Sequence, residues 1–301
     1  MSLERWTMKR TALLGLVATV VAVVAISGRS IAQEYAQASV RAAAKPHPLD
    51  SMIRYSSAHA DYIRQNVHDY SYRLVKRERL NGKLQAYQFA DVLVRCEREN
   101  EDGSFQPLSV FMQFLAPKEV VDRRVLYVAD KNDGKVLVRK GGVLMKHLKL
   151  KVDPNSERAK SESKNSITDI GFDKLIMGLV DQAKLEIELD PTAENTQVTH
   201  FQNAVVNKRS CTHVRIVHPE QRGEMEYHMV SLYIDDQLHV PARLVTYGWP
   251  EKEGEKPPVQ EEYTYLNLKL NVGFTDSDFA ESLLEEPELS IASQDKTVTR
   301  N

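Results

Sequence analysis

The side chains that could carry catalysis or bind a metal are scattered along this sequence. The nine histidines follow no known motif, and His213 and His218 fall on opposite faces of one predicted strand. His228 and His239 flank a predicted hairpin and could meet across it, but two histidines without a third ligand make a weak metal site. The sequence has no nucleophile elbow, phosphate-binding glycine loop or paired cysteine motif. We therefore predict a protein that is not an enzyme, with no catalytic residue, metal or cofactor.

The carboxylates gather only where turns explain them. Asp130 and Asp133 belong to one predicted turn, and Asp235 and Asp236 belong to another. No spacing selects a carboxylate pair of the kind that hydrolyses glycosides. The charged run KRER at residues 76–79 contains both signs and points to alternate faces of its predicted strand, so we interpret it as a solvent-facing surface.

Cys96 and Cys211 are the only cysteines, and both fall in or at the end of a predicted strand. In an oxidising compartment they could form a disulfide, and chain entropy would then contribute up to about 4–5 kcal/mol. Two separate buried thiols are the alternative, because nothing in the sequence shows that the two strands are neighbours.

The first 32 residues have the layout of a secretory signal peptide. A basic start precedes the apolar run TALLGLVATVVAVVAI, and Ser30 and Ala32 suit the −3 and −1 positions of a cleavage site. The 16 residues of this run fall short of the roughly 20 that span a bilayer, which favours cleavage over an uncleaved anchor. We predict a signal peptide at 1–32, a flexible tether at 33–47, a single domain at 48–284 and a polar tail at 285–301. The mature protein would be periplasmic or secreted, after cleavage near Ala32, and would not span the membrane.

The predicted fold is organised around residues 105–142, which read as three antiparallel strands with a turn at residues 132–135. The strand VFMQFL is apolar on both faces, because Val110, Met112 and Phe114 alternate with Phe111 and Leu115. A strand with one wet face would instead alternate apolar with polar residues. Both faces must therefore be covered or line a cavity.

The remaining patterns surround this stretch with two helices and more strands. Apolar spacing predicts helices over residues 49–67 and from Thr168 or Asp169 to Ala183. A hairpin about Asn81-Gly82 joins strands 70–80 and 84–98, and the polar stretch 153–166 is an exposed loop that serves as a lid or a spacer. Other predicted strands cover residues 143–152, 197–206, 211–218, 224–234, 238–249 and 259–272. Thr275 with Asp278 resembles a capping box that opens a short helix.

These elements predict an α+β fold: a strongly curved antiparallel β-sheet, in the form of a half-open barrel of about ten strands, with helices packed on its concave face. A sheet closed by so few helices tends to leave a groove, and methionine suits varied apolar partners. The cavity-lining candidates are Phe111, Met112, Phe114, Leu115, Leu126, Met145, Leu175, Leu179 and Met229.

The order of these elements and three sequence stretches carry a family resemblance. The element order and the stretch VFMQFLAPKEVVDRRVLYVADKNDGKVLVRKGG resemble the LolA/LolB-like lipoprotein-carrier superfamily. Together with SITDIGFDKLI at 166–176 and FTDSDF at 274–279, this stretch more closely resembles a planctomycete-type secreted family of uncharacterised function. The resemblance covers about residues 49–279 and implies an open β-barrel with a helical lid over an apolar cavity. No ligand-binding residue of the true carriers matches a position here.

We predict that the protein binds an apolar ligand, such as a lipid or a lipoprotein acyl chain, in envelope lipoprotein or lipid trafficking. Lipoproteins or envelope proteins would be its partners. A structural or protein-interaction module whose concave face is filled by its own helices is the alternative, and an unrecognised hydrolase is a third. The formal charge of −2 gives no electrostatic reason to expect nucleic acid.

Overall fold

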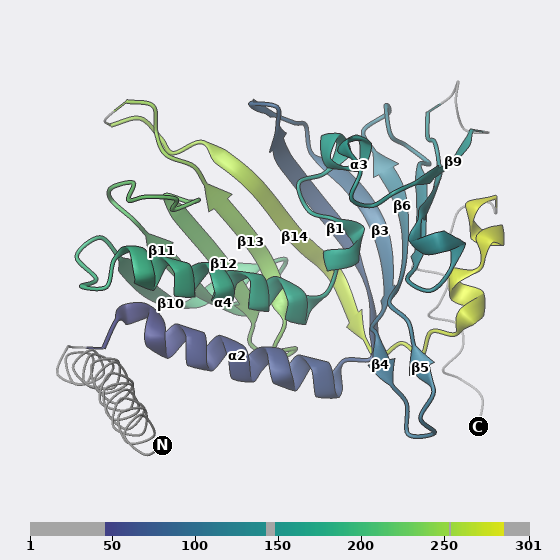
Figure 1. The fold of residues 1–301 in the computed structure, drawn as a ribbon, viewed down its shortest axis with the longest axis horizontal. Helices are drawn as coiled ribbons and strands as arrows, with labels where there is room; N and C mark the ends of the chain where they lie inside the picture. Colours follow the sequence, from purple (N-terminus) through teal and green to yellow (C-terminus); the bar gives the residue numbers. More distant parts are fainter. Residues whose placement is uncertain (1–45, 143–147, 253, 286–301) are drawn as a thin grey trace, which may run out of the picture. The chain divides into compact units, whose positions relative to one another are not determined.

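A computed structural model describes residues 46–142, 148–252 and 254–285 of the protein. Within these residues one antiparallel sheet of twelve strands curves around two long helices (Figure 1). The predicted α+β class and the open, curved sheet are confirmed, with two strands more than expected. The predicted signal peptide, nearly all of the tether and the tail from residue 286 lie outside the described residues.

The strands of the large sheet follow the order β10-β11-β12-β13-β14-β1-β3-β6-β7-β8-β9, and β2 pairs with β1. The first half of the chain supplies β1 (Asp69–Leu80), β2 (Lys83–Leu84), β3 (Gln88–Arg95), β6 (Ser109–Ala116), β7 (Arg124–Val128), β8 (Val136–Arg139) and β9 (Lys149–Val152). The second half supplies β10 (Gln197–Val206), β11 (Arg209–Val217), β12 (Met229–Asp235), β13 (Pro241–Tyr247) and β14 (Val259–Leu270). A separate hairpin pairs β4 (Arg98–Glu99) with β5 (Phe105–Gln106). Because β9 and β10 end the order without pairing, the sheet is not closed.

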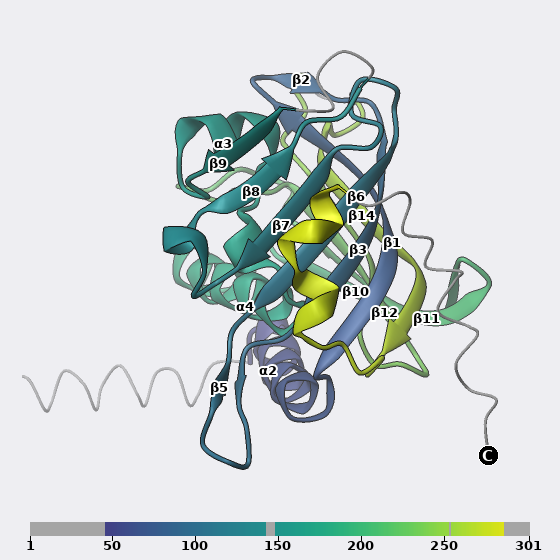
Figure 2. The same cartoon turned by 90° about the vertical axis from the view of Figure 1, so that its right-hand side faces the viewer.

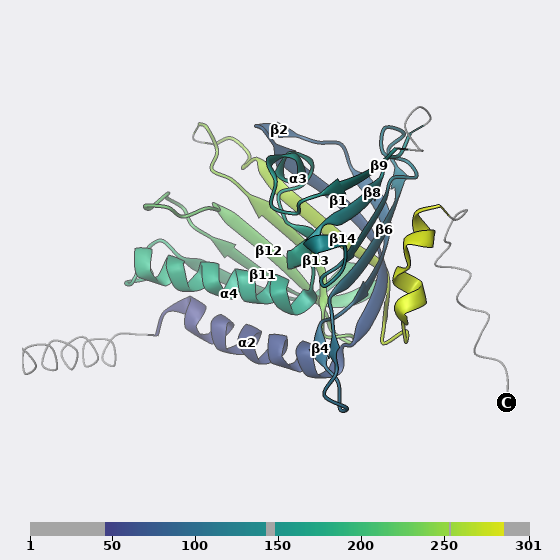
Figure 3. The same cartoon turned by 45° about the vertical axis from the view of Figure 1, so that its right-hand side comes forward.

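Two amphipathic helices, α2 (Pro48–Asn66) and α4 (Phe172–Leu189), run side by side along the inner face of the sheet (Figures 1 and 3). A capping box starts α2: the His47 ring accepts from the N–H of Leu49 at 3.2 Å, and Asp50 accepts from the N–H of His47 at 3.0 Å. At the start of α4 the Phe172 ring stacks on Tyr70 of β1, with centroids 4.5 Å apart. The two helices thus pack on the sheet through an aromatic and aliphatic core.

The helix α4 starts later and ends later than the apolar spacing predicts. Ser166 caps a separate 3-10 turn over Ile167–Asp169, so the chain bends once before Phe172 begins the helix. The helix then continues past Ala183 to Leu189, and Glu186, three residues after Ala183, extends its buried face. The stretch before it, predicted as an irregular loop, contains the short helix α3 (Glu157–Glu162).

The outer face of strands β3, β6, β7 and β8 is also dry. Two 3-10 turns, η3 (Asp276–Phe279) and η4 (Glu281–Leu284), lie across it (Figure 2). Thr275 and Asp278 form the predicted capping box of η3. The buried Asp69 carboxylate accepts the N–H groups of Gly273 and Phe274 at 3.1 and 3.3 Å, which fixes this C-terminal segment beside β1. The cluster it seals consists of Leu93, Phe111, Leu126, Val128, Leu137, Phe274, Phe279, Leu283 and Leu284.

Candidate functional site

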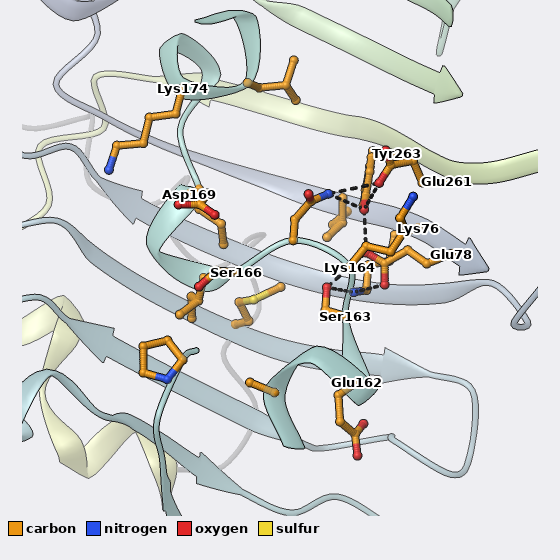
Figure 4. Close-up of a pocket in the computed structure, with 18 of the residues that line it drawn as sticks. Lys76, Glu78, Glu162, Ser163, Lys164, Ser166, Asp169, Lys174, Glu261 and Tyr263 are labelled. Carbon is orange, nitrogen blue, oxygen red and sulfur yellow. Dashed lines mark hydrogen bonds and ion pairs between the residues drawn. The ribbon is translucent and has the colours of Figure 1, made fainter. Parts of the chain in front are cut away.

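A cavity of about 860 Å³ lies between the inner face of the sheet and the chain that leads from β9 into α4. Strands β1 and β6 to β9 form one wall, and one side of α4 forms another. Residues 153–166, which we call the roof segment, cross the cavity and bring α3 to its rim (Figure 4). The apolar lining includes Tyr70, Tyr72, Leu74, Met112, Phe114, Val125, Val138, Leu150, Ile167, Leu175, Met177, Leu179 and Tyr265.

The strand β6 presents its two faces to different surroundings. Met112 and Phe114 point inward and line the cavity. Phe111 points outward, is 1% exposed and packs with Leu126 beneath the C-terminal segment. Both faces of the strand are therefore covered, as its apolar pattern predicts, but by different layers.

Of the nine cavity candidates named from the sequence, four line the cavity: Met112, Phe114, Leu175 and Leu179. The placement of Phe111 and Leu126 on the cavity is wrong, because the C-terminal turns cover their face of the sheet. Leu115 and Met229 are half-buried near strand ends and do not line the cavity. Met145 lies outside the described residues.

The roof segment is attached to the sheet by a buried polar network rather than by apolar packing (Figure 4). Ser163 donates to Glu78 at 3.0 Å, and Asn165 donates to Glu261 at 3.1 Å. The Tyr263 hydroxyl lies between the two carboxylates, 2.5 Å from Glu78 and 3.1 Å from Glu261. Burial, followed by the charges of Glu261 and Glu78, raises the pKa of Tyr263 well above its ordinary value, so the phenol stays a donor.

This network corrects our interpretation of the charged run at residues 76–79. Lys76 and Glu78 are both buried on the inner face and form an ion pair of 3.0 Å, whereas Arg77 binds Glu262 on the outer face. The sequence feature that indicates this inner-face position is the two-residue period of a strand, because Lys76 and Glu78 share the face of Tyr70, Tyr72 and Leu74. The roof segment is accordingly a wall of the cavity and not a plain spacer.

A second buried polar cluster fixes the C-terminal end of α4. Nε2 of His218 lies 3.2 Å from the Glu186 carboxylate, and its Nδ1 lies 3.1 Å from the carbonyl of Asn195. Asp190 accepts from Thr196 at 2.7 Å and from Arg222 at 2.7 Å. These contacts join α4 to β11 and the loops beside it, away from the cavity lining.

Other predicted pairings do not form. Cys96, directly after β3, and Cys211, on β11, are free thiols. The strands β1, β14, β13 and β12 separate β3 from β11 in the sheet order, so the structure has the two separate thiols and not the disulfide. Burial raises the pKa of Cys96 to about 12. His228 contacts the carbonyl of His218 at 2.8 Å, while His239 lies beside His59 of α2. Within the described ranges no three histidine, cysteine or carboxylate side chains gather as metal ligands would.

Residues 67–288 match the protein family described as a protein of unknown function, DUF1571. The chain belongs to this family. No curated protein matches the sequence.

Several solved structures are similar to this DUF1571 protein. One is the MucA/MucB complex of Pseudomonas aeruginosa, with 12% identity, 76% of this chain and 62% of that chain covered, and a TM-score of 0.39. Another is an outer membrane lipoprotein-sorting protein domain from Vibrio parahaemolyticus (10% identity, 78% and 100% covered, TM-score 0.35). A third is a LolA superfamily protein from Nitrosomonas europaea (10% identity, 76% and 98% covered, TM-score 0.31). One of these three structures is thus of the LolA superfamily, which the sequence is predicted to resemble.

No helix in the described part of the DUF1571 protein combines the length and the apolar character needed to cross a membrane.

Proposed function

We propose that this protein is a periplasmic or secreted binding protein for an apolar ligand, such as a lipid or a lipoprotein acyl chain, and that it performs no catalysis. The observation that carries the proposal is the cavity between the sheet, α4 and the roof segment. Its volume of about 860 Å³ falls within the range of about 300–1,000 Å³ that is typical of small-molecule sites. Lipoproteins or other envelope components are the partners that would deliver or receive such a ligand.

The lining supports an apolar ligand because α4 leaves part of its apolar surface facing the cavity. On α4, Phe172, Ile176 and Val180 are buried in the core, while Leu175 and Leu179 turn toward the cavity and remain half-buried. An acyl chain that filled this space would remove further apolar surface from water, which contributes about 25 cal/mol per Å². The alternative of a module with a filled concave face has less support, because the helices leave this part of the sheet uncovered.

The one arrangement in the cavity that resembles a catalytic dyad does not support hydrolysis. Lys76 and Ser163 lie 3.1 Å apart, but the ammonium group donates to the serine and also pairs with Glu78. In a Ser–Lys dyad the lysine must accept the serine proton, whereas here Lys76 donates to Ser163, and Ser163 donates to Glu78, a carboxylate that also accepts from Lys76 and Tyr263. These contacts favour attachment of the roof segment over nucleophile activation.

Blocking the cavity tests the proposal. We expect Leu179→Trp to fill part of the cavity and to weaken binding of the neutral probe N-phenyl-1-naphthylamine about tenfold, equivalent to about 1.4 kcal/mol. Leu185→Trp is the matched control, because Leu185 lies on the same helix but is 39% exposed. Fluorescence titration measures the affinity, and native mass spectrometry of the purified protein shows whether lipid remains bound.

The proposal would be wrong if the purified wild-type protein carried no lipid and did not take up the probe. Equal affinities of both tryptophan variants would move the site away from α4. Far-ultraviolet circular dichroism and thermal unfolding establish that each variant is folded.

A further inference from the structure

We propose that the ligand is an acidic amphiphile, with its chain in the apolar part of the cavity and its negatively charged head beside Lys140 and Arg158. This inference rests on the proposed function and adds the chemical class of the ligand. It derives from the order of the inward-facing residues along the strands and from the balance of ion pairs around the cavity.

The strand register places the inward-facing residues in rows across the sheet. The row that pairs Met112 with Val125, Val125 with Val138 and Val138 with Leu150 is wholly apolar. At the next inward position toward the roof, β6 stays apolar with Phe114, but the positions beside β7 and β8 become basic: Arg123 precedes β7 and Lys140 follows β8. The cavity wall therefore grades from apolar to basic along the strand direction, as an amphiphile with an anionic head requires.

The acidic side chains of the cavity wall already have donors. Glu78 and Glu261 belong to the roof network on β1 and β14, with Lys76, Ser163, Asn165 and tyrosine hydroxyls as partners. The other four acids are also paired or hydrogen-bonded: Glu162 with Arg123, Glu226 with Lys164, Asp181 with Lys184, and Asp169 with the Thr168 hydroxyl. None of them needs a cation from the ligand.

Two cations that line the cavity have no acidic partner among residues 46–142, 148–252 and 254–285: Lys140 and Arg158. Lys160 pairs with Glu157 and Lys174 with Glu97, each at 2.9 Å. Lys140 is half-buried at the end of an apolar strand, where an unpaired ammonium costs solvation energy that an anionic group would recover. Arg158 offers the planar fork that suits carboxylate or phosphate oxygens, and it projects from α3 at the cavity rim.

The test compares cis-parinaric acid with its methyl ester, which share one chain and differ in the charge of the head. We expect the full-length wild-type protein to bind the acid at least about tenfold more tightly than the ester at low salt, and the advantage to shrink as salt is added. Lys140→Gln should remove most of this advantage and leave the affinity for the ester within about twofold, whereas Lys140→Arg should retain the advantage. Lys151→Gln is the charge-matched control, because Lys151 is exposed on the neighbouring strand and lies outside the cavity.

Equal affinity for acid and ester in the wild-type protein would overturn the inference while leaving the apolar-ligand function intact. Failure to bind either compound would count against the proposed function itself. An acid preference that survives Lys140→Gln and Arg158→Gln together would show that the head lies elsewhere. Millimolar inorganic phosphate should not compete with the acid, because phosphate has no chain. If phosphate displaced the acid but not the ester, these cations would bind a free anion, and the amphiphile assignment would be wrong.

Discussion

At the scale of single residues, His218 shows how a buried ring can remain basic. Burial alone would lower the pKa of His218, but contact with the Glu186 carboxylate and with the carbonyl of Asn195 outweighs burial, and the pKa is raised above its ordinary value of 6.5. Asp190 adds a further negative charge from the end of α4. The folded protein therefore holds the histidine proton more tightly than the unfolded chain does.

A raised pKa contributes stability that is fully present below pH 6.5 and is lost as the pH rises through the folded-state value. We expect the part of the free energy of unfolding that depends on His218 to fall as the pH rises above about 6.5. Glu186→Gln should flatten this dependence, and urea unfolding at a series of pH values measures it.

His213→Gln serves as the comparison. Burial and then the charges of Arg215 and Arg243 lower the pKa of His213, so the ring is neutral in both states once the pH lies well above 6.5. The slope above that pH should be unchanged in this variant. A slope that Glu186→Gln leaves intact would show that another group titrates.

At the scale of elements, α4 divides its apolar stripe between the core and the cavity. Ile176 is 2% exposed and packs in the core, whereas Leu175 is half-buried and lines the cavity. We expect Ile176→Ala to lower the free energy of unfolding by about 2–5 kcal/mol, as large-to-small changes in a packed core do. Leu175→Ala should cost less, about 0.5–2 kcal/mol, because part of its surface meets no protein atoms.

Urea unfolding of delipidated protein gives both values. Added lipid should stabilise the wild-type protein more than Leu175→Ala, because a ligand stabilises the folded state to which it binds and Leu175 lines the cavity. If both variants lost a similar free energy of unfolding in the absence of lipid, α4 would bury its whole apolar stripe.

The sequence predicts most of these elements because their signals are local. The Asn81-Gly82 turn has the positive φ angles, 49° and 77°, that this dipeptide favours, and the Thr275–Asp278 capping box forms as expected. A local sequence pattern does not show which part of the chain covers each face of the sheet. The alternation of β6 separates Phe111 from Met112 but does not show that distant turns at residues 276–284 cover one of them. The strand period assigns Lys76 and Glu78 to the inner face, but it does not show that Ser163 and Tyr263, which are distant in sequence, meet them there.

At the scale of the whole molecule, the C-terminal turns keep the second face of the sheet dry. Arg124 is buried on β7 and donates to the carbonyl of Leu283 at 2.7 Å, while Phe279 packs on the outer cluster. A chain ending at Gly273 would expose Phe111, Leu126 and their neighbours. We expect this variant to bind 1-anilinonaphthalene-8-sulfonate, a dye for exposed apolar surface, and to aggregate.

A chain ending at Glu285 is the control for this truncation, because it keeps every residue of η3 and η4. It should match the full-length protein in dye binding and in its unfolding midpoint. Equal dye binding by the two truncated chains would show that the outer face does not depend on the C-terminal turns.

The pairing of β1 with β14 has a consequence for the way the chain acquires its structure. These are the first and last strands of the large sheet in sequence, yet they are hydrogen-bonded neighbours at its centre, from Tyr70–Leu270 to Glu78–Glu261. During synthesis β1 emerges early, with β2 and then β3 as its first partners, and its other edge stays open until almost the entire chain has followed. Closing so long a loop is slow, and an open strand edge attracts other chains in the meantime. The centre of the sheet is therefore completed last, and the cavity and the aromatic core around Tyr70 depend on that final step.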